Sequence, residues 1–230
     1  MKKTFYKKTA ALLALVASLG LSFSAAAVPA NYSFTGAFNA DDNVQFFNFT
    51  ADGTSGVRLI SYSYGGGTQA NGNAVQAGGF DPILALFDST GQLLAINDDA
   101  GDGNNGACDA TAVNADPIGG VRDTCLDLSL GAGDYQVALL QFDNFPVGLI
   151  LSEGFGNTGN PTFTSGYGCT NGQFCDAGGN NRTNQWAFDI LNVEGASLGL
   201  GPQGQVPEPA TVALLGLGLI GLGYARRRVS

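Results

Sequence analysis

The sequence predicts an all-β protein, a single antiparallel β-sandwich of jelly-roll-like type. Short segments alternate apolar and polar residues and are rich in Val, Ile, Phe and Tyr, as half-buried strands are. Glycine-rich turn signals, such as Gly65-Gly66-Gly67 and Asn171-Gly172, separate these segments. Between the two ends of the chain, no segment has the apolar stripe of an amphipathic helix. Many short strands joined by turns favour a sandwich or a barrel.

The expected strands follow in chain order at residues 32–38, 44–49, 57–64, 83–87, 93–96, 125–130, 135–142 and 185–193. Aromatic residues within them supply much of the expected core, namely Phe46, Phe47, Phe49, Trp186 and Phe188. Residues 154–184 are rich in Gly, Asn and Thr and show little periodicity, so we expect a long loop there. The sandwich domain is expected to span residues 28–194.

Residues 1–27 have the features of a secretory signal peptide. Lysines precede an apolar stretch at residues 10–21, and small residues ending in Ala25-Ala26-Ala27 follow it. We expect cleavage after Ala27. The chain is therefore expected to be exported, and this segment takes no part in the fold.

The C-terminus carries Val206-Pro207-Glu208-Pro209, then an uncharged run at residues 210–225, then Arg226-Arg227-Arg228. As a helix the run would extend about 24 Å, against about 30 Å for a bilayer core. It is a marginal transmembrane span that suits a temporary anchor. The arginines would stay on the cytoplasmic side and hold the domain on the outer side. Glycine-rich residues 195–205 are expected to link the domain to this tail.

This order of parts resembles the PEP-CTERM sorting tail of Gram-negative bacteria, in which a Pro-Glu-Pro box, a hydrophobic helix and an Arg cluster are read by an exosortase. The resemblance implies an exosortase and the secretion machinery as partners, with transient anchoring in the inner membrane. The final location would be the cell surface or the extracellular space. Because PEP-CTERM sorting is associated with exopolysaccharide production, exopolysaccharide or biofilm matrix is a further implied partner.

The body of the chain, residues 28–205, is strongly acidic. Arg58, Arg122 and Arg182 are its basic residues, no lysine remains, and eighteen acids give it a net charge of −15. Such a surface repels nucleic acid and anionic lipid. We therefore expect no nucleic-acid partner, and the charge favours solubility or cation binding.

The chain has four cysteines, Cys108, Cys125, Cys169 and Cys175. An even number in an exported protein indicates disulfides, and four cysteines allow three pairings. We favour Cys108 with Cys125 and Cys169 with Cys175, because each pair closes one polar or glycine-rich loop. A structural zinc site is disfavoured, since the chain has no histidine and no paired C-x-x-C units.

An Asp-rich stretch after residue 80 is the main candidate for chemistry. In a hairpin that turns near Thr90, residues whose numbers sum to about 180 face each other, which brings Asp81 near Asp98 and Asp99. Repelling carboxylates of this kind are relieved by a hard cation, and calcium takes six to eight oxygen ligands. The candidate ligands are Asp81, Asp98, Asp99, Asp102, Asn104 and Asp109. The alternative, that Asp, Asn and Gly simply favour turns, stays open.

The same stretch carries a second resemblance. The segments Asp81-Pro-Ile-Leu-Ala-Leu-Phe-Asp88, Asn97-Asp98-Asp99, Leu130-Gly-Ala-Gly-Asp-Tyr135 and Trp186-Ala-Phe-Asp-Ile-Leu-Asn-Val193 are similar to an uncharacterised domain family found on PEP-CTERM-sorted proteins. The hairpin also resembles bacterial pre-peptidase C-terminal domains, small β-sandwiches that often bind calcium. The resemblance implies a noncatalytic surface domain and supplies no ligand.

Three classes of function remain to be compared. The first is a noncatalytic, calcium-stabilised domain of the cell envelope or exopolysaccharide matrix. The second is a carbohydrate-binding module that stacks sugars on exposed Tyr62, Tyr64, Tyr167 or Phe145. The third is a glycoside-active enzyme with two carboxylates about 5 to 10 Å apart. Because the chain has no histidine, Ser-His-Asp and Cys-His mechanisms are excluded, and we expect no catalytic residues.

Overall fold

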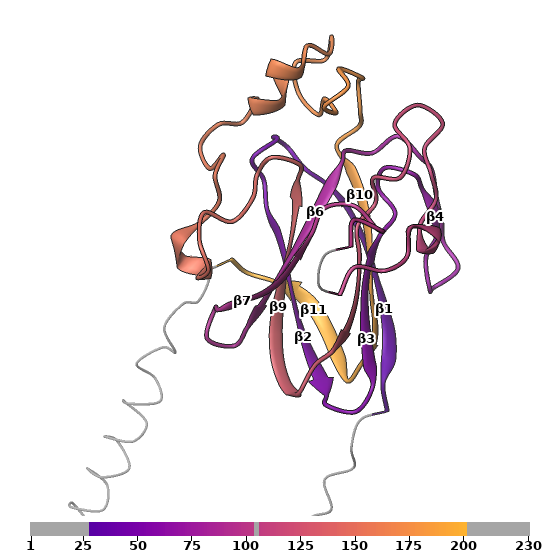
Figure 1. Cartoon of the computed structure of the whole chain (residues 1–230), viewed down its shortest axis with the longest axis vertical. Helices are drawn as coiled ribbons and strands as arrows, with labels where there is room; N and C mark the ends of the chain where they lie inside the picture. Colours follow the sequence, from indigo (N-terminus) through magenta and orange to yellow (C-terminus); the bar gives the residue numbers. More distant parts are fainter. Residues whose placement is uncertain (1–27, 104–105, 202–230) are drawn as a thin grey trace, which may run out of the picture.

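The computed structural model describes residues 28–103 and 106–201, and within them two antiparallel sheets pack face to face (Figure 1). The first sheet has the order β1 (Ala30–Ala37), β10 (Gln185–Val193), β3 (Gly56–Ser61) and β8 (Cys125–Ser129). The second has the order β11 (Gly195–Gly199), β2 (Gln45–Asp52), β9 (Ala132–Gln141), β6 (Pro82–Asp88) and β7 (Leu93–Asn97). Smaller elements are β4 (Gly67–Thr68), β5 (Ala74–Val75) and the 3-10 helices η1 (Ala110–Ala112), η2 (Leu151–Glu153) and η3 (Phe163–Tyr167).

The strand pairing is nested. Strand β1 pairs with β10, β2 with β9, β3 with β8 and β6 with β7, as if one long hairpin had been rolled up. Successive pairs fall in alternate sheets, and the last of them, the β6–β7 hairpin, lies beside β9 in the second sheet. This is the arrangement of a jelly roll, in which long connections cross between the sheets. The expected all-β sandwich is confirmed.

The core between the sheets follows from strand alternation. Phe47 and Phe49 point from β2 into the interior, while Trp186 and Phe188 point inward from β10. The rings of Phe47 and Trp186 meet edge to face with centroids 5.7 Å apart. Such contacts add to the free energy that burial of the rings itself contributes. The aromatic core expected from the sequence is thus largely confirmed.

Phe46 is the exception, because it points to the outer face of the second sheet. It lies there in an outer apolar cluster with Ile83 and Phe87, and Phe155 from the loop after β9 covers part of the cluster. Strand β6 is consequently apolar on both faces and buried from Pro82 to Phe87. Its near-continuous apolar sequence reflects this covering.

All the expected strands form, with ends shifted by a few residues, and three further strands appear. Strand β3 ends at Ser61, before the expected end at residue 64. Strands β4 and β5 form a two-stranded ribbon that the short, polar segment did not indicate. Residues 195–199 were expected to begin a linker, and this is wrong. They form β11, because the otherwise free edge of β2 offers backbone groups for pairing.

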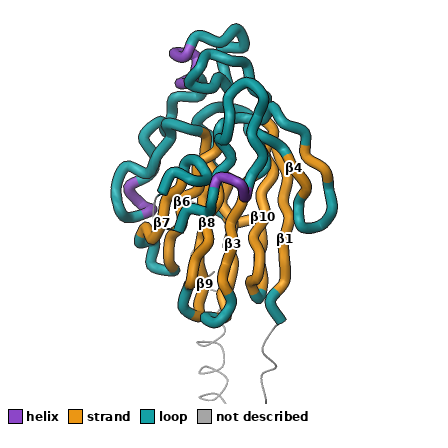
Figure 2. The backbone as a smooth tube through the Cα atoms, turned by 45° about the vertical axis from the view of Figure 1, so that its right-hand side comes forward, coloured by secondary structure: helices purple, strands orange, loops and turns teal. Residues whose placement is uncertain are grey.

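The segment 154–184 has no strand, as expected, and closes over one end of the sandwich. Figure 2 shows loops gathered at that end of the strands. Buried Asp41 holds the segment, since its carboxylate accepts hydrogen bonds from the amides of Thr164 and Phe174. A disulfide between Cys169 and Cys175 closes its tip. Buried hydrogen bonds therefore attach the segment 154–184 to the sandwich.

The expected signal peptide at residues 1–27 and the tail at residues 206–230 lie outside the described residues. Within the part of the chain that the structure describes, no helix is long and apolar enough to cross a membrane.

Candidate metal centre

Three segments of the chain meet at one end of the second sheet, namely the residues before β6, the residues after β7 and the residues after β9. The β6–β7 pairing places Leu84 opposite Asn97, so the residue before β6 lies beside the residues after β7. The β6–β9 pairing places Pro82 opposite Gln141, and the amide of Phe142 donates to the carbonyl of Asp81 at 2.8 Å. The starts and ends of these strands thus share one site.

Asp81, Asp98 and Asp99 converge at this site. One carboxylate oxygen from each lies within 4.8 Å of the others. Asp81 is buried, with 3% of its surface exposed, and the other two are half-buried. The hairpin register expected from the sequence is confirmed to within one residue, because the β6–β7 pairs sum to one more than expected.

These carboxylates are incompletely satisfied. The Oδ1 atoms of Asp81, Asp98 and Asp99 are all buried, and none accepts a hydrogen bond from a described residue. Buried carboxylates without partners are rare, since the loss of hydration is not compensated. Each of the three aspartates thus has one buried oxygen that lacks a hydrogen bond from the described residues.

Another buried acid of the same protein shows the contrast. Asp123 is fully buried, and its oxygens accept hydrogen bonds from the hydroxyl of Ser61 and the amides of Ser63, Tyr64 and Gly65. Burial of a carboxylate elsewhere in this fold is therefore accompanied by full hydrogen bonding. The acidic cluster does not follow that pattern.

The electrostatics of the cluster are unfavourable without a cation. Burial, followed by the charges of Asp98 and Asp99, raises the pKa of Asp81 to about 8. Burial and the charge of Asp99 raise the pKa of Asp98 to about 7. Burial also raises the pKa of Asp99, although Arg122 acts against it through an ion pair of 3.0 Å. One guanidinium faces three carboxylates, so negative charge remains in excess.

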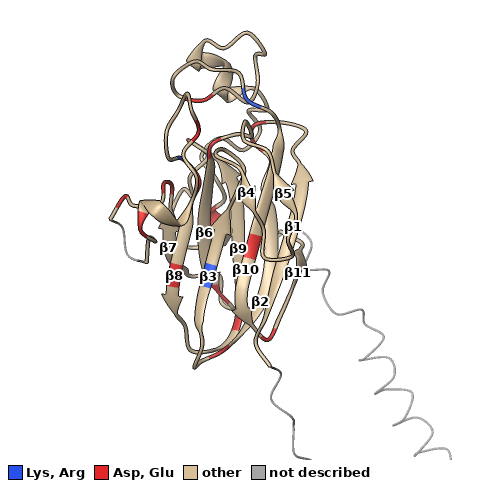
Figure 3. Ribbon diagram, turned by 90° about the vertical axis from the view of Figure 1, so that its right-hand side faces the viewer, with Lys and Arg blue, Asp and Glu red and all other residues tan. Residues whose placement is uncertain are grey.

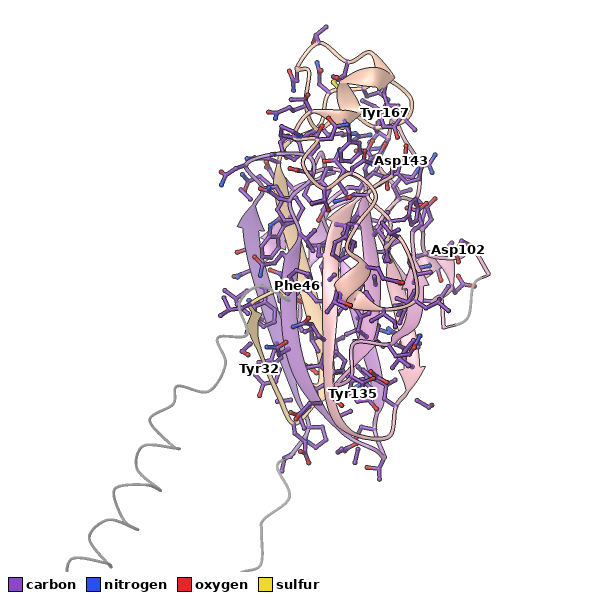
Figure 4. The ribbon with its side chains drawn as sticks, turned by 90° about the vertical axis from the view of Figure 1, so that its left-hand side faces the viewer. Tyr32, Phe46, Asp102, Tyr135, Asp143 and Tyr167 are labelled. Carbon is purple, nitrogen blue, oxygen red and sulfur yellow. A yellow bond between two sulfur atoms is a disulfide. The ribbon has the colours of Figure 1, made fainter. Side chains whose placement is uncertain are left out.

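The other expected ligands stand apart from this group. Asp102 is exposed, on a loop at the side of the molecule (Figure 4), and its charge raises the pKa of Asp98 and Asp99. Asp109 is exposed and caps η1, where its carboxylate accepts from the amide and hydroxyl of Thr111. Asn104 lies outside the described residues. The structure thus brings together three of the expected ligands.

Asp143 and Tyr167 are neighbours of the site that sequence reasoning missed. The two labelled side chains approach each other in Figure 4, and the Tyr167 hydroxyl donates to the Asp143 carboxylate. The pKa of Tyr167 is raised by burial and by this bond, and further by the charges of Asp81 and Asp98. Asp143 has a positive φ of 72°, which non-glycine residues seldom adopt. The sequence did offer one indication of Asp143, because this residue directly follows the expected strand at residues 135–142.

Both favoured disulfides are present, and one supports the metal loop. Cys108 is bonded to Cys125, and Cys169 to Cys175. The amide of Gly101 donates to the carbonyl of Cys108 at 2.8 Å, and Cys108 in turn donates to Cys125 at 3.0 Å. The loop that follows Asp99 is therefore fastened to β8.

The aromatic residues considered for sugar stacking do not form an exposed platform. Tyr64 is buried, with its ring beneath the Arg182 guanidinium and its hydroxyl bonded to Asp176. Tyr62 and Tyr167 are half-buried, and Phe145 packs against the outer apolar cluster. Tyr64 is therefore not the exposed stacking residue that the sugar-binding alternative requires, because Gly119 from the loop before β8 and Asp176 and Arg182 from the segment 154–184 cover it.

The basic residues of the body are all paired with acids. Arg58 pairs with Asp127 at 2.6 Å, Arg122 with Asp99, and buried Arg182 with both Asp116 and Asp176. Figure 3 shows acidic residues spread over both sheets and the loops, with few basic ones. The surface is accordingly dominated by negative charge.

Residues 205–228 match the PEP-CTERM protein-sorting motif. The match covers the expected sorting residues and not the sandwich domain. A motif of this kind implies an exported protein that an exosortase sorts. The two disulfides agree with export, because such bonds persist in oxidising compartments. No curated protein matches the chain in sequence.

Proposed function

We propose that the protein is a noncatalytic domain of the cell surface or extracellular matrix whose loops are stabilised by calcium bound to Asp81, Asp98 and Asp99. One observation carries this proposal. Asp81, Asp98 and Asp99 bring one carboxylate oxygen each within 4.8 Å of one another, and each also has a buried oxygen without a hydrogen-bond partner among the described residues. A bound cation would satisfy all three at once.

The chemistry of the donors favours calcium over other metals. Carboxylates are hard oxygen ligands, whereas zinc and copper prefer the imidazole and thiolate groups that this site lacks. Asp98 and Asp99 are half-buried, so water has access to complete a shell of six to eight oxygens. Magnesium requires a near-ideal octahedron and loses water reluctantly, which suits three ligands from separate loop positions less well.

Calcium at this position would act on the fold. Asp81 immediately precedes β6, while Asp98 and Asp99 follow β7, so one ion would join both ends of the hairpin where it meets the loop after β9. Without the ion the carboxylates repel one another. We infer a structural role, in which export into a calcium-containing medium completes the fold.

The acidic body supports a location in a hydrated matrix. The sorting motif implies processing by an exosortase, and we propose that the uncharged run at residues 210–225 holds the protein at the inner membrane only until that step. A net charge of −15 keeps the domain soluble and allows cations to bridge it to other anionic matrix components. We therefore propose association with exopolysaccharide or biofilm as its setting.

The absence of catalysis is part of the proposal. With no histidine in the chain, the common general base is missing. The three clustered carboxylates converge on one point within 4.8 Å, whereas glycosidases need two carboxylates on opposite sides of a bound sugar. Turnover of a polysaccharide by the pure protein would contradict this part.

Thermal unfolding of the purified full chain tests the metal site. At calcium about 100-fold above Kd, binding to the folded state alone adds about 2.7 kcal/mol. For a domain of this size the midpoint should rise by roughly 5 to 10 °C. Asp81→Asn should abolish the rise. Asp109→Asn is the matched control, because it removes an acid of the same region that lies outside the cluster. An unchanged midpoint in the original protein would refute the site.

A further inference from the structure

The outer face of the second sheet is divided into a covered part and an open part. Phe46 and Ala138 lie opposite each other on β2 and β9, and both belong to the outer apolar cluster that Phe155 covers. In Figure 4, Phe46 marks the level of this covered part and Tyr135 the level of the open part. The outward-facing side chains of β2 and β9 are apolar only in the part of the face that the loop carrying Phe155 covers.

The outward-facing residues of the open part are polar. Asn48 lies opposite Gln136, and the Gln136 amide donates to the Asn48 side-chain oxygen at 2.7 Å. One step further along, Thr50 lies opposite Asp134 and donates to its carboxylate at 2.6 Å. These bonds orient the four side chains. Within the described residues, the Asn48 amino group and the second Asp134 oxygen have no partner.

A groove of about 730 Å³ lies over these two polar pairs. The β6–β7 turn and residues 150–152 form one wall, and β11 with Leu200 forms the other. The walls present exposed apolar side chains, with Ile150 47% and Leu200 67% exposed. The groove therefore has a polar floor and partly apolar walls.

These features select one class of ligand. Each sugar hydroxyl is both a donor and an acceptor, and the amides, hydroxyls and carboxylate of the floor supply both functions. The C–H faces of a pyranose ring can pack on the apolar walls. Among the described lining residues Asp88 and Asp134 are the charged ones and none is basic, so an anionic ligand would be repelled.

We propose that this groove binds a neutral oligosaccharide. The site goes beyond the calcium centre and is separate from it, since Asp81 precedes β6 and Asp88 ends it, about 20 Å apart along the strand. Its residues also differ from the tyrosines first considered for sugar stacking. Recognition here depends on the polar cross-strand pairs of β2 and β9.

Gly195 allows the groove to be blocked. It lies opposite Thr50, a Cβ added to it would meet no atom within 4 Å, and its φ is not in the left-handed region. Gly195→Trp should therefore fill the groove without disturbing the sheet. Gly56→Trp is the matched control, because Gly56 is equally open and lies on the other sheet. Gln136→Ala is a second, smaller change that tests the floor directly.

The experiment is an NMR titration of the purified full chain with cellotetraose, maltotetraose and mannotetraose. At least one should give saturable shifts in residues 48, 50, 134, 136 and 197. Gly195→Trp should weaken binding at least 10-fold and Gln136→Ala about 5-fold, with Gly56→Trp unchanged. Addition of EDTA should leave the affinity unaltered, which separates this site from the calcium centre. The absence of saturable shifts with all three sugars, or equal affinity in Gly195→Trp, would overturn the proposal.

Discussion

Arg182 stacks on Tyr64 in the interior of the loop-covered end, with its guanidinium carbon 3.6 Å from the centre of the ring. The same guanidinium pairs with Asp116 at 3.2 Å and Asp176 at 3.0 Å, and all of these side chains are buried. The network joins the segment 154–184 to the loops after β3 and η1. The network lies beside the metal centre, and the Arg182 guanidinium neutralises its carboxylates.

Removal of Arg182 should strongly destabilise the fold. Arg182→Ala leaves two buried carboxylates without their neutralising cation, and breaking a buried ion pair in this way costs about 3 to 5 kcal/mol. Chemical denaturation measures the change. The control is Arg58→Ala, since Arg58 and Asp127 are both more than 40% exposed and such pairs contribute about 1 kcal/mol or less. Equal losses in the two variants would contradict the network's role.

The stability of the calcium-free protein should fall as pH rises from about 4 to 8. The folded pKa values of Asp81, about 8, and Asp98, about 7, lie above the unfolded value of 3.8. The folded state therefore retains protons that the unfolded state has released, and raising the pH removes this advantage. Calcium should reverse the trend, because it takes the place of those protons.

Melting curves between pH 4 and 9, with EDTA or with calcium, test this dependence. Asp81→Asn should flatten the EDTA curve in the upper part of the range. Asp176 has the opposite sign: burial acts to raise its pKa, but hydrogen bonds from Asn180, Tyr64 and Arg182 lower it to about 2. Its stabilisation is present above pH 4 and is lost toward pH 2. A midpoint in EDTA that rises steadily to pH 8 would be the contrary result.

The disulfide between Cys108 and Cys125 should support calcium affinity. It fastens the loop that follows Asp99, through the bond from the Gly101 amide to the Cys108 carbonyl. The double variant Cys108→Ser/Cys125→Ser should bind calcium about 10-fold more weakly, as measured by calorimetry. The comparison is Cys169→Ser/Cys175→Ser, which opens the remote loop tip and should leave the affinity unchanged. If both variants bind alike, the loop does not depend on its covalent tie.

Tyr167 should couple the covering segment to the metal centre. Its hydroxyl donates to Asp143 beside the cluster, so Tyr167→Phe leaves that carboxylate without its donor. We expect faster amide exchange in residues 162–168 and a change of a few-fold in calcium affinity. Thr164→Val, which removes the hydroxyl bonded to Asp41 on the same segment, should speed exchange without altering affinity. Calcium binding that is identical in Tyr167→Phe would exclude the coupling.

Much of the fold and the centre of the site follow from local patterns. Alternation along β2 and β10 predicts strands because side chains on a strand point to opposite faces, and the Asp81–Asp99 meeting follows from the turn near Thr90 alone. The orphan state of the three oxygens could not be predicted this way. It depends on the absence of donors from elements distant in the chain.

The sequence by itself determined the C-terminal sorting motif, the acidic charge, the strand positions and the cysteine pairs, because each depends on composition or on neighbours within one hairpin or loop. The tertiary structure decided the rest. Residues 195–199 became a strand only because β2 had an open edge, and Asp109 became the cap of η1, where its carboxylate accepts hydrogen bonds from Thr111. The polar groove, likewise, exists only because β2, β9 and β11 align residues that lie far apart in the chain. Contacts between residues far apart in the chain depend on how the strands pack, and a local sequence pattern does not predict that packing.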